Sequence, residues 1–122
     1  MTKNMAERHC VACEAGTPPL SMEKAREMME QVPGWTLHEE ATGDARSVPK
    51  LERALRLKDF AAAMLFVNRV AEVAEQEGHH PDIYISWNRV RLELTTHAIK
   101  GLSENDFIMA SKINLLVDGP PI

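Results

Sequence analysis

The sequence predicts an α+β domain: a four-stranded antiparallel sheet with helices packed on one face. Apolar positions alternate in four short segments and recur at helical spacing in three others. The links within each strand pair are too short for parallel crossovers. The expected order is α-β-β-α-β-β-α. With the helices on one face, the other face of the sheet is left to solvent, a partner or a substrate.

Length and composition fit one globular domain. The chain has 122 residues, 44% of them hydrophobic and 26% charged, as in ordinary soluble proteins rather than disordered or membrane proteins. A net charge of -4 argues against direct nucleic-acid binding, which needs a basic surface. The N-terminus has no apolar segment of signal-peptide length, and two cysteines fit a reducing compartment. We expect a cytoplasmic protein with an extension at 1–19, a domain at 20–118 and a tail at 119–122.

The first half of the domain combines a short helix with two strands. Ser21 suits the N-cap of a helix over about 22–31, which a Pro-Gly pair ends. Residues 35–40, WTLHEE, alternate as a strand does. Residues 50–57, KLERALRL, fit a strand or a helix by pattern. We predict a strand there, because the following segment has its own helix start.

The clearest element is a helix over about 58–77, closed by Gly78 as its C-cap. Its apolar residues form two neighbouring stripes, which together are wider than one sheet requires. The stripes are Phe60, Met64, Val67, Ala71 and Ala74, and Ala63, Phe66, Val70 and Val73. We expect the excess apolar surface to bind a second subunit; the alternative is a deeply buried helix.

A hairpin and a final helix complete the domain. Residues 82–87 and 89–96 alternate apolar and polar positions, with a turn between them. The final helix is expected over about 103–117. Ser103 and Asp106 form an S-x-x-D capping arrangement at its start.

Three histidines fall at the ends of these elements. His79 and His80 lie between the long helix and the hairpin, and His97 is expected to end the last strand. A suitable strand order would gather all three beside Asp106, whose charge the helix dipole favours. Imidazoles donate and accept protons near neutral pH, which suits acid/base catalysis. A three-histidine metal site and purely structural roles are the alternatives.

The N-terminal segment HCVAC, residues 9–13, contains a C-x-x-C motif preceded by a histidine. This spacing serves either a metal ion or a redox pair. A zinc site needs about four ligands, and no second C-x-x-C or H-x-x-x-H follows. Two small thiols in an N-terminal extension are the simplest interpretation.

A spaced set of residues resembles the signature of the pterin-4a-carbinolamine dehydratases. It consists of E-x-x-x-H-H-P (Glu75, His79, His80 and Pro81), Trp87, His97 in TTH and Asp106 in GLSENDF. The similarity extends to PGW at Trp35 and to LKDFAAAMLFVNRVAEVAE, and it covers about residues 20–117. A signature spread over most of a small chain is more specific than any one of its parts.

The resemblance implies an enzyme that dehydrates 4a-hydroxytetrahydropterin to quinonoid dihydropterin, recycling the cofactor of aromatic amino-acid hydroxylases. It implies no metal, no organic cofactor, and a homodimer or homotetramer, which we place at the long helix and a sheet edge. By resemblance, His79 and His97 are the acid/base pair, His80 holds the substrate and Asp106 orients a histidine. The resemblance also implies a pocket shaped by Glu75, Pro81 and Trp87.

The same resemblance supports a second hypothesis, a non-catalytic interaction protein of the same fold. Such a protein would assist the assembly of another enzyme such as RuBisCO, or stabilise the dimer of a transcription factor. The wide apolar surface of the long helix would serve that role. The joint presence of the three histidines favours the enzyme, with a hydroxylase or an assembly client as a further protein partner.

Overall fold

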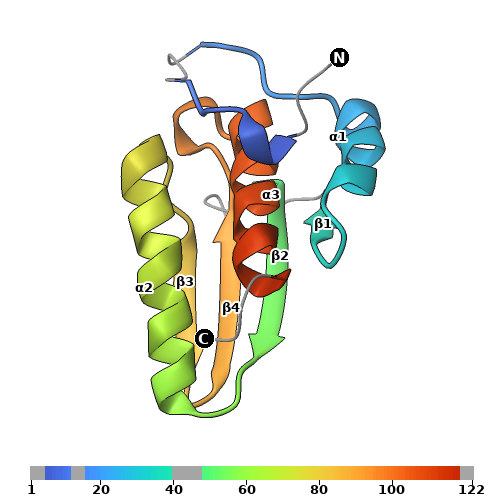
Figure 1. Cartoon of the computed structure of the whole chain (residues 1–122). Coiled ribbons are helices and arrows are strands. Elements are labelled where there is room, and N and C mark those ends of the chain that lie inside the picture. The colour runs from blue at the N-terminus through green and yellow to red at the C-terminus, as the bar shows by residue number, and fades with distance from the viewer. Residues whose placement is uncertain (1–4, 12–15, 40–47, 119–122) are drawn as a thin grey trace.

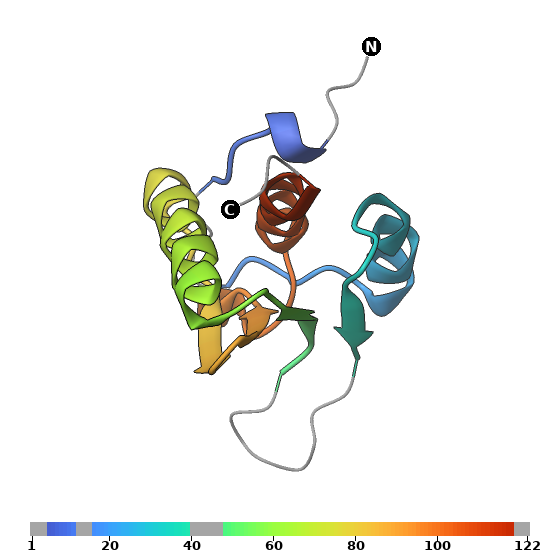
Figure 2. The ribbon, with the colours of Figure 1, turned by 60° about the horizontal axis from the view of Figure 1, so that its bottom comes forward.

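In the computed structural model, which describes residues 5–11, 16–39 and 48–118, one sheet carries all the α-helices on one face (Figures 1 and 2). The sheet order is β1-β2-β4-β3, and every neighbouring pair is antiparallel. The strands are β1 (Thr36–His38), β2 (Lys50–Arg56), β3 (Asp82–Ser86) and β4 (Arg89–Leu94). The helices are α1 (Met22–Met28), α2 (Phe60–Glu77) and α3 (Glu104–Asp118), with short 3-10 helices η1 (Met5–Glu7), η2 (Met29–Gln31) and η3 (His97–Ile99). The expected α+β class is confirmed.

The helix boundaries follow their caps. The Ser21 hydroxyl accepts a hydrogen bond from the Lys24 backbone N–H at 3.1 Å, as an N-cap does. Asp59 caps α2 in the same way, so this helix begins at Phe60 rather than at residue 58. Gly78 ends α2 in the left-handed conformation, with a φ of 65°, which a residue without Cβ adopts at little cost.

The two faces of the sheet differ as the alternating sequence predicts. On β4, Val90, Leu92 and Leu94 are buried beneath the helices, whereas Arg89 and Arg91 are exposed on the other face. The helix side of the core includes Phe66 and Val70 from α2 and Phe107, Ile108 and Ile113 from α3. Each such side chain contributes about 1.5–3 kcal/mol when it is fully buried. This core fixes the ends of α2, β4 and α3 relative to one another.

The last strand is shorter than predicted. It ends at Leu94, so His97 begins η3 instead of ending a strand, and that prediction is wrong. The chain turns back because Thr96 and Gly101 pair as an isolated bridge around η3. The turn also needs glycine at position 101, since a Cβ there would lie 2.7 Å from the Pro19 Cβ.

The first strand is also short, because Trp35 leaves the ladder and packs into the core. Trp35 is 6% exposed, and its indole N–H donates to the Asn114 side-chain oxygen at 2.8 Å. The end of the predicted strand at residue 40, most of the following loop and the tail at 119–122 lie outside the described residues.

The described part of the N-terminal segment, residues 5–11, packs against α3. Met5 is 4% exposed and belongs to the core. The Lys112 ammonium donates to the Ala6 carbonyl oxygen at 2.9 Å. Figure 2 shows η1 beside α3, on the side away from the sheet. Among the helices of the described ranges, none is long and apolar enough to cross a bilayer.

Candidate functional site

A pocket of about 500 Å³ lies at the end of the sheet where α2 ends and η3 and α3 begin. Short connections bring these three ends together, and each contributes polar side chains. The pocket is lined by Val11, Glu77, Gly78, His79, His80, Thr95, Thr96, His97, Ala98 and Asn105. The structure therefore gathers the three predicted histidines around one cavity.

The central contact of this site joins His79 to Asp106. The imidazole Nε2 lies 2.7 Å from Asp106 Oδ1, with the His79 side chain 12% exposed and that of Asp106 fully buried. A carboxylate at one ring nitrogen fixes both the orientation of the ring and its tautomer. No hydrogen bond to His79 Nδ1 occurs within the described residues. This nitrogen is therefore available to bind a ligand or to accept or donate a proton.

Asp106 is held in place by the start of α3. Its second oxygen, Oδ2, accepts hydrogen bonds from the Thr96 hydroxyl at 2.8 Å and the Ser103 backbone N–H at 3.0 Å. The latter bond, together with the Ser103 hydroxyl accepting from the Asn105 N–H at 3.2 Å, forms a capping box. The predicted capping pair is therefore also the support of the histidine site. These bonds, with that to His79, satisfy both oxygens of the buried carboxylate.

His80 and His97 are placed differently from His79. His80 Nε2 lies 2.5 Å from Glu75 Oε2, and both side chains are mostly exposed. Such an exposed pair contributes about 0–1 kcal/mol to stability. His97 projects from η3, is exposed and lines the pocket. Both histidines therefore remain accessible to a ligand.

Three other predicted residues do not line the pocket. Glu75 reaches the site only through its contact with His80, and Pro81 joins His80 to β3. The structure places Trp87 in the β3–β4 turn, 68% exposed. Five residue steps along β3 span roughly 17 Å, so Trp87 lies at the opposite end of the sheet from His80. The two-residue hairpin turn, set by the pairing of Ser86 with Arg89, fixes it there.

The pocket also contains residues that the sequence did not single out. Asn105 holds Val11 at the rim from both sides: its Oδ1 accepts from the Val11 N–H at 3.0 Å, and its Nδ2 donates to the Val11 carbonyl at 2.5 Å. The paired threonines before His97 were the available signal for Thr95 and Thr96, since polar side chains directly after a buried strand often hold a turn. Val11 had no such signal, because its contacts are long-range.

Glu77 anchors the N-terminal segment beside the pocket. Its carboxylate accepts from the Cys10 N–H at 2.7 Å and contacts His9 Nδ1 at 2.9 Å and Lys112 Nζ at 3.8 Å. Burial opposes ionisation of this carboxyl, but these contacts outweigh burial and lower the pKa of Glu77. The segment is thereby tied to the end of α2.

The surroundings of the Cys10 thiol, which lies beside this carboxylate, disfavour its ionisation and so lower its reactivity. Burial, followed by the negative charge of Glu77, raises the pKa of Cys10 to about 12. Since the thiolate is the nucleophile and metal ligand, this environment disfavours both roles for Cys10. Cys13 lies outside the described residues. Within the described ranges, no group of three or more His, Cys, Asp or Glu side chains is arranged to hold a metal ion.

Comparisons with known proteins agree with the resemblance seen in the sequence. A family model described as pterin 4 alpha carbinolamine dehydratase matches residues 18–116. A relative from Methylococcus capsulatus is 43% identical over 113 residues, covering 93% of each chain. The Arabidopsis thaliana protein named pterin-4-alpha-carbinolamine dehydratase 2, mitochondrial, is 41% identical over 115 residues, covering 93% of this chain and 59% of that protein.

Two solved structures share the fold. A transcriptional coactivator/pterin dehydratase from Brucella melitensis has a TM-score of 0.68 and 31% identity, covering 80% of this chain and 97% of that one. A pterin dehydratase-like protein identified as a RuBisCO assembly factor in the alpha-carboxysome has a TM-score of 0.56 and 19% identity, covering 71% and 93%. The second likeness shows the fold alone. Both the extent of the family match and the identity to these relatives place this chain in the pterin 4 alpha carbinolamine dehydratase family.

Proposed function

We propose that this protein dehydrates 4a-hydroxytetrahydropterin to quinonoid dihydropterin and water by histidine acid/base catalysis. The observation that carries the proposal is the contact of His79 with the buried Asp106, beside a pocket that His79, His80 and His97 line. The names of the relatives and of the family model support the same activity. A pocket of about 500 Å³ falls in the range usual for small organic ligands.

The reaction needs one proton acceptor and one proton donor. The N5–H proton leaves to a base, the N5 electron pair forms the N5=C4a double bond, and the C4a–O bond breaks. An acid protonates the departing hydroxyl, which leaves as water. Neutral imidazole accepts a proton and imidazolium donates one near neutral pH, so two histidines that reach N5 and the 4a-hydroxyl serve both steps.

We assign His79 and His97 to this acid/base pair. Asp106 keeps His79 Nε2 engaged, so that proton transfer uses Nδ1. His97, exposed on η3, supplies the second group. His80, held by Glu75, contacts the bound pterin and positions it.

The test is the rate at which the purified protein consumes freshly generated 4a-hydroxytetrahydropterin, followed by stopped-flow absorbance. We expect a His79→Ala/His97→Ala double variant to lose about 10²-fold or more in rate, while Arg69→Ala on the exposed face of α2 retains the wild-type rate. Circular dichroism confirms that each variant is folded. Equal rates for the double variant and Arg69→Ala would remove the two histidines from the mechanism.

The physiological setting that we propose is recycling of the pterin cofactor used by aromatic amino-acid hydroxylases. A hydroxylase is then the natural protein partner, since it releases the carbinolamine substrate. We further propose that the protein is a homodimer or homotetramer formed through α2 and a sheet edge. Phe60 and Leu65 on α2 are each 51% exposed, and large apolar side chains at this exposure favour a protein contact.

The same exposed side chains favour a second candidate function, the binding of another protein. One structural neighbour is described as a coactivator and another as an assembly factor. If the wild-type protein gives no turnover above the spontaneous rate while remaining folded, a scaffold or assembly role becomes the better explanation. Phe60 and Leu65 are then the first residues to substitute in a binding assay.

A further inference from the structure

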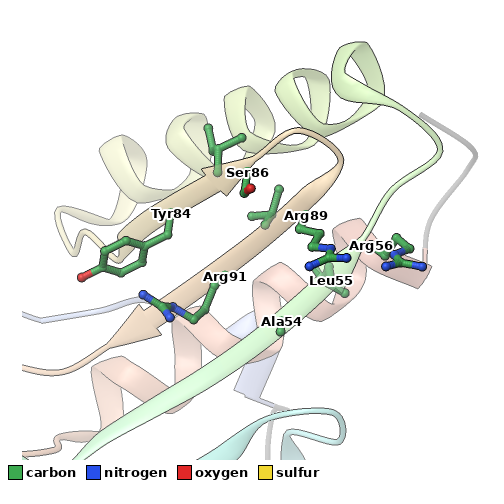
Figure 3. Close-up of a pocket in the computed structure, with 9 residues that line it drawn as sticks. Ala54, Leu55, Arg56, Tyr84, Ser86, Arg89 and Arg91 are labelled. Atoms are coloured by element: carbon green, nitrogen blue, oxygen red, sulfur yellow. The ribbon is translucent and has the colours of Figure 1, made fainter.

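A second cavity, of about 470 Å³, lies on the open face of the sheet, at the end opposite the histidine pocket (Figure 3). We propose that it docks an acidic segment of a partner protein, with a carboxylate held between Arg56 and Arg89. The charged, polar and small side chains around the hollow come from three strands and lie on the face of the sheet that carries no helix. They include Ala54, Arg56, Tyr84, Ser86, Arg89 and Arg91.

The strand register creates the hollow. Arg91 lies directly across from Ala54 on one side and from Tyr84 on the other. Two residues along β4, in the next pair on the same face, Arg89 lies across from Arg56. Because Ala54 has only a methyl side chain, the long arginine and tyrosine side chains rise around it. The result is a basic hollow open to solvent.

The charge in this hollow is unbalanced. Like charges directly opposite each other on neighbouring strands are destabilising, yet Arg56 and Arg89 form such a pair. Neither makes an ion pair with any carboxylate of the described residues. Arg91 differs, since its Nε lies 3.7 Å from a Glu52 oxygen and 3.6 Å from a Glu93 oxygen. In a chain with a net charge of -4, two adjacent unpaired guanidinium groups provide a site for an external oxyanion.

The neighbouring apolar surface indicates a polypeptide as the occupant. Tyr84 on this face is 46% exposed, and Trp87 in the adjoining β3–β4 turn is 68% exposed. Arginine, tyrosine and tryptophan are the residue types that dominate binding energy in protein interfaces. A small metabolite is usually enclosed by its site, whereas no helix or loop of the described chain covers this face in Figure 3. A partner segment with an acidic side chain beside an apolar one would match this surface, because the acidic group would contact the arginines and the apolar group the exposed aromatic side chains.

Two other occupants fit less well. Single-stranded nucleic acid stacks its bases on free aromatic faces, but the Arg91 guanidinium already lies 4.1 Å from the centre of the Tyr84 ring. A second copy docked with its two-fold axis through this hollow would place the same arginines against each other. The charge pattern therefore favours a different, acidic protein.

The experiment measures binding of a fluorescein-labelled peptide, Glu-Leu-Glu-Glu-Leu-Glu, by fluorescence anisotropy. We expect wild-type protein to bind it with an affinity that falls as salt is added. An Arg56→Gln/Arg89→Gln variant should bind about 10-fold or more weakly. A charge-matched control, Lys24→Gln/Arg69→Gln, removes two exposed cations elsewhere and should bind within twofold of wild type.

Arginine Nε–H resonances give a second measurement on the wild-type protein. Addition of the peptide should shift the two Nε–H signals that disappear in the Arg56→Gln/Arg89→Gln variant, and leave that of Arg69 in place. Absent peptide binding, equal losses in the arginine and control variants, or tighter binding of a labelled hexauridine would each overturn the proposal. The arginine variant should keep the wild-type dehydration rate, so this proposal stands or falls separately from the proposed catalysis.

Discussion

Asp106 is the residue on which the proposed chemistry depends most. It accepts three hydrogen bonds, from His79 Nε2, the Thr96 hydroxyl and the Ser103 N–H. An Asp106→Asn substitution keeps the shape but places an amide NH₂ against one of these donors. We expect kcat to fall by about 10²-fold with little change in KM, and the free energy of unfolding to fall by about 1–3 kcal/mol.

Steady-state kinetics and thermal unfolding of the folded variant test this expectation. Glu75→Gln is the matched control, because it neutralises the carboxylate partner of an exposed histidine, His80. Its stability should change by no more than about 1 kcal/mol. A wild-type kcat in Asp106→Asn would show that the pair is structural.

Cys10 is predicted to react slowly. A pKa raised to about 12 by burial and by Glu77 leaves the thiol protonated at pH 8, where an ordinary cysteine is partly ionised. In a Cys13→Ala variant, iodoacetamide should modify Cys10 at least about 10-fold more slowly in the native protein than in urea. Because an unfolded thiol ionises near pH 8.5 and the native one does not, Cys10 also makes the fold less stable above that pH. Equal native and unfolded rates would contradict the raised pKa of Cys10.

The residues of the site were predictable only in part from spacing. His79 and Asp106 are 27 positions apart, so no local pattern joins them. The positions of the element ends suggested that the histidines gather beside Asp106, and the resemblance implied that Asp106 orients one of them. His97 was expected to end a strand, but the bridge between Thr96 and Gly101 redirects the chain first. Trp87 matched the motif in sequence and yet lies at the far end of β3, because hairpin register rather than sequence proximity sets its place.

At the scale of elements, the contact between the N-terminal segment and α2 depends on Glu77. Burial would raise its pKa, but hydrogen bonds from Cys10 and His9 and the charge of Lys112 outweigh burial and lower the pKa in the folded protein. The stability from the ionised carboxylate is therefore fully present above its unfolded pKa of about 4.3. That stability is lost as the pH falls through the lower, folded pKa.

Glu77→Gln should accordingly cost about 1–3 kcal/mol at pH 7, with a smaller difference from wild type as the solution is made more acidic. Urea unfolding at pH 7, 5 and 3.5 measures this difference. Glu72→Gln, on the exposed surface of the same helix, serves as the control. A difference that stays constant down to pH 3.5 would show that the charge of Glu77 does not secure the segment.

Element identity was more predictable than element ends. Caps at Ser21 and Gly78 gave the limits of helices correctly, because capping is a local interaction between a side chain or αL residue and nearby backbone. The 3-10 turns η2 and η3 were not predicted. They follow α1 and β4, where long-range contacts rather than local sequence decide how the regular element ends. The docking of residues 5–11 was missed for the same reason.

For the whole molecule, the alternating pattern correctly predicted one helix layer on one face of the sheet, while the surfaces left uncovered became known only from packing. The structure buries some residues of the predicted apolar stripes of α2 and leaves others exposed. Phe66, Val67 and Val70 are buried against the core, whereas Phe60 is 51% exposed. Leu65, outside both stripes, is equally exposed. The surface available to a second subunit is therefore narrower than the stripes suggested, and it lies at the N-terminal half of the helix.

This remaining surface leads to a prediction for the assembly. Light scattering at micromolar concentration should give a mass of two or four times the 13.7 kDa chain. A Phe60→Asp/Leu65→Asp variant removes two half-exposed apolar side chains and adds charges, which should weaken association by at least about 2 kcal/mol, roughly 30-fold in dissociation constant. Asn68→Asp/Gln76→Asp adds the same charge on the same helix and should keep the wild-type mass. A wild-type monomer would instead leave Phe60 and Leu65 free for a different protein, because apolar side chains this exposed gain free energy only when something covers them.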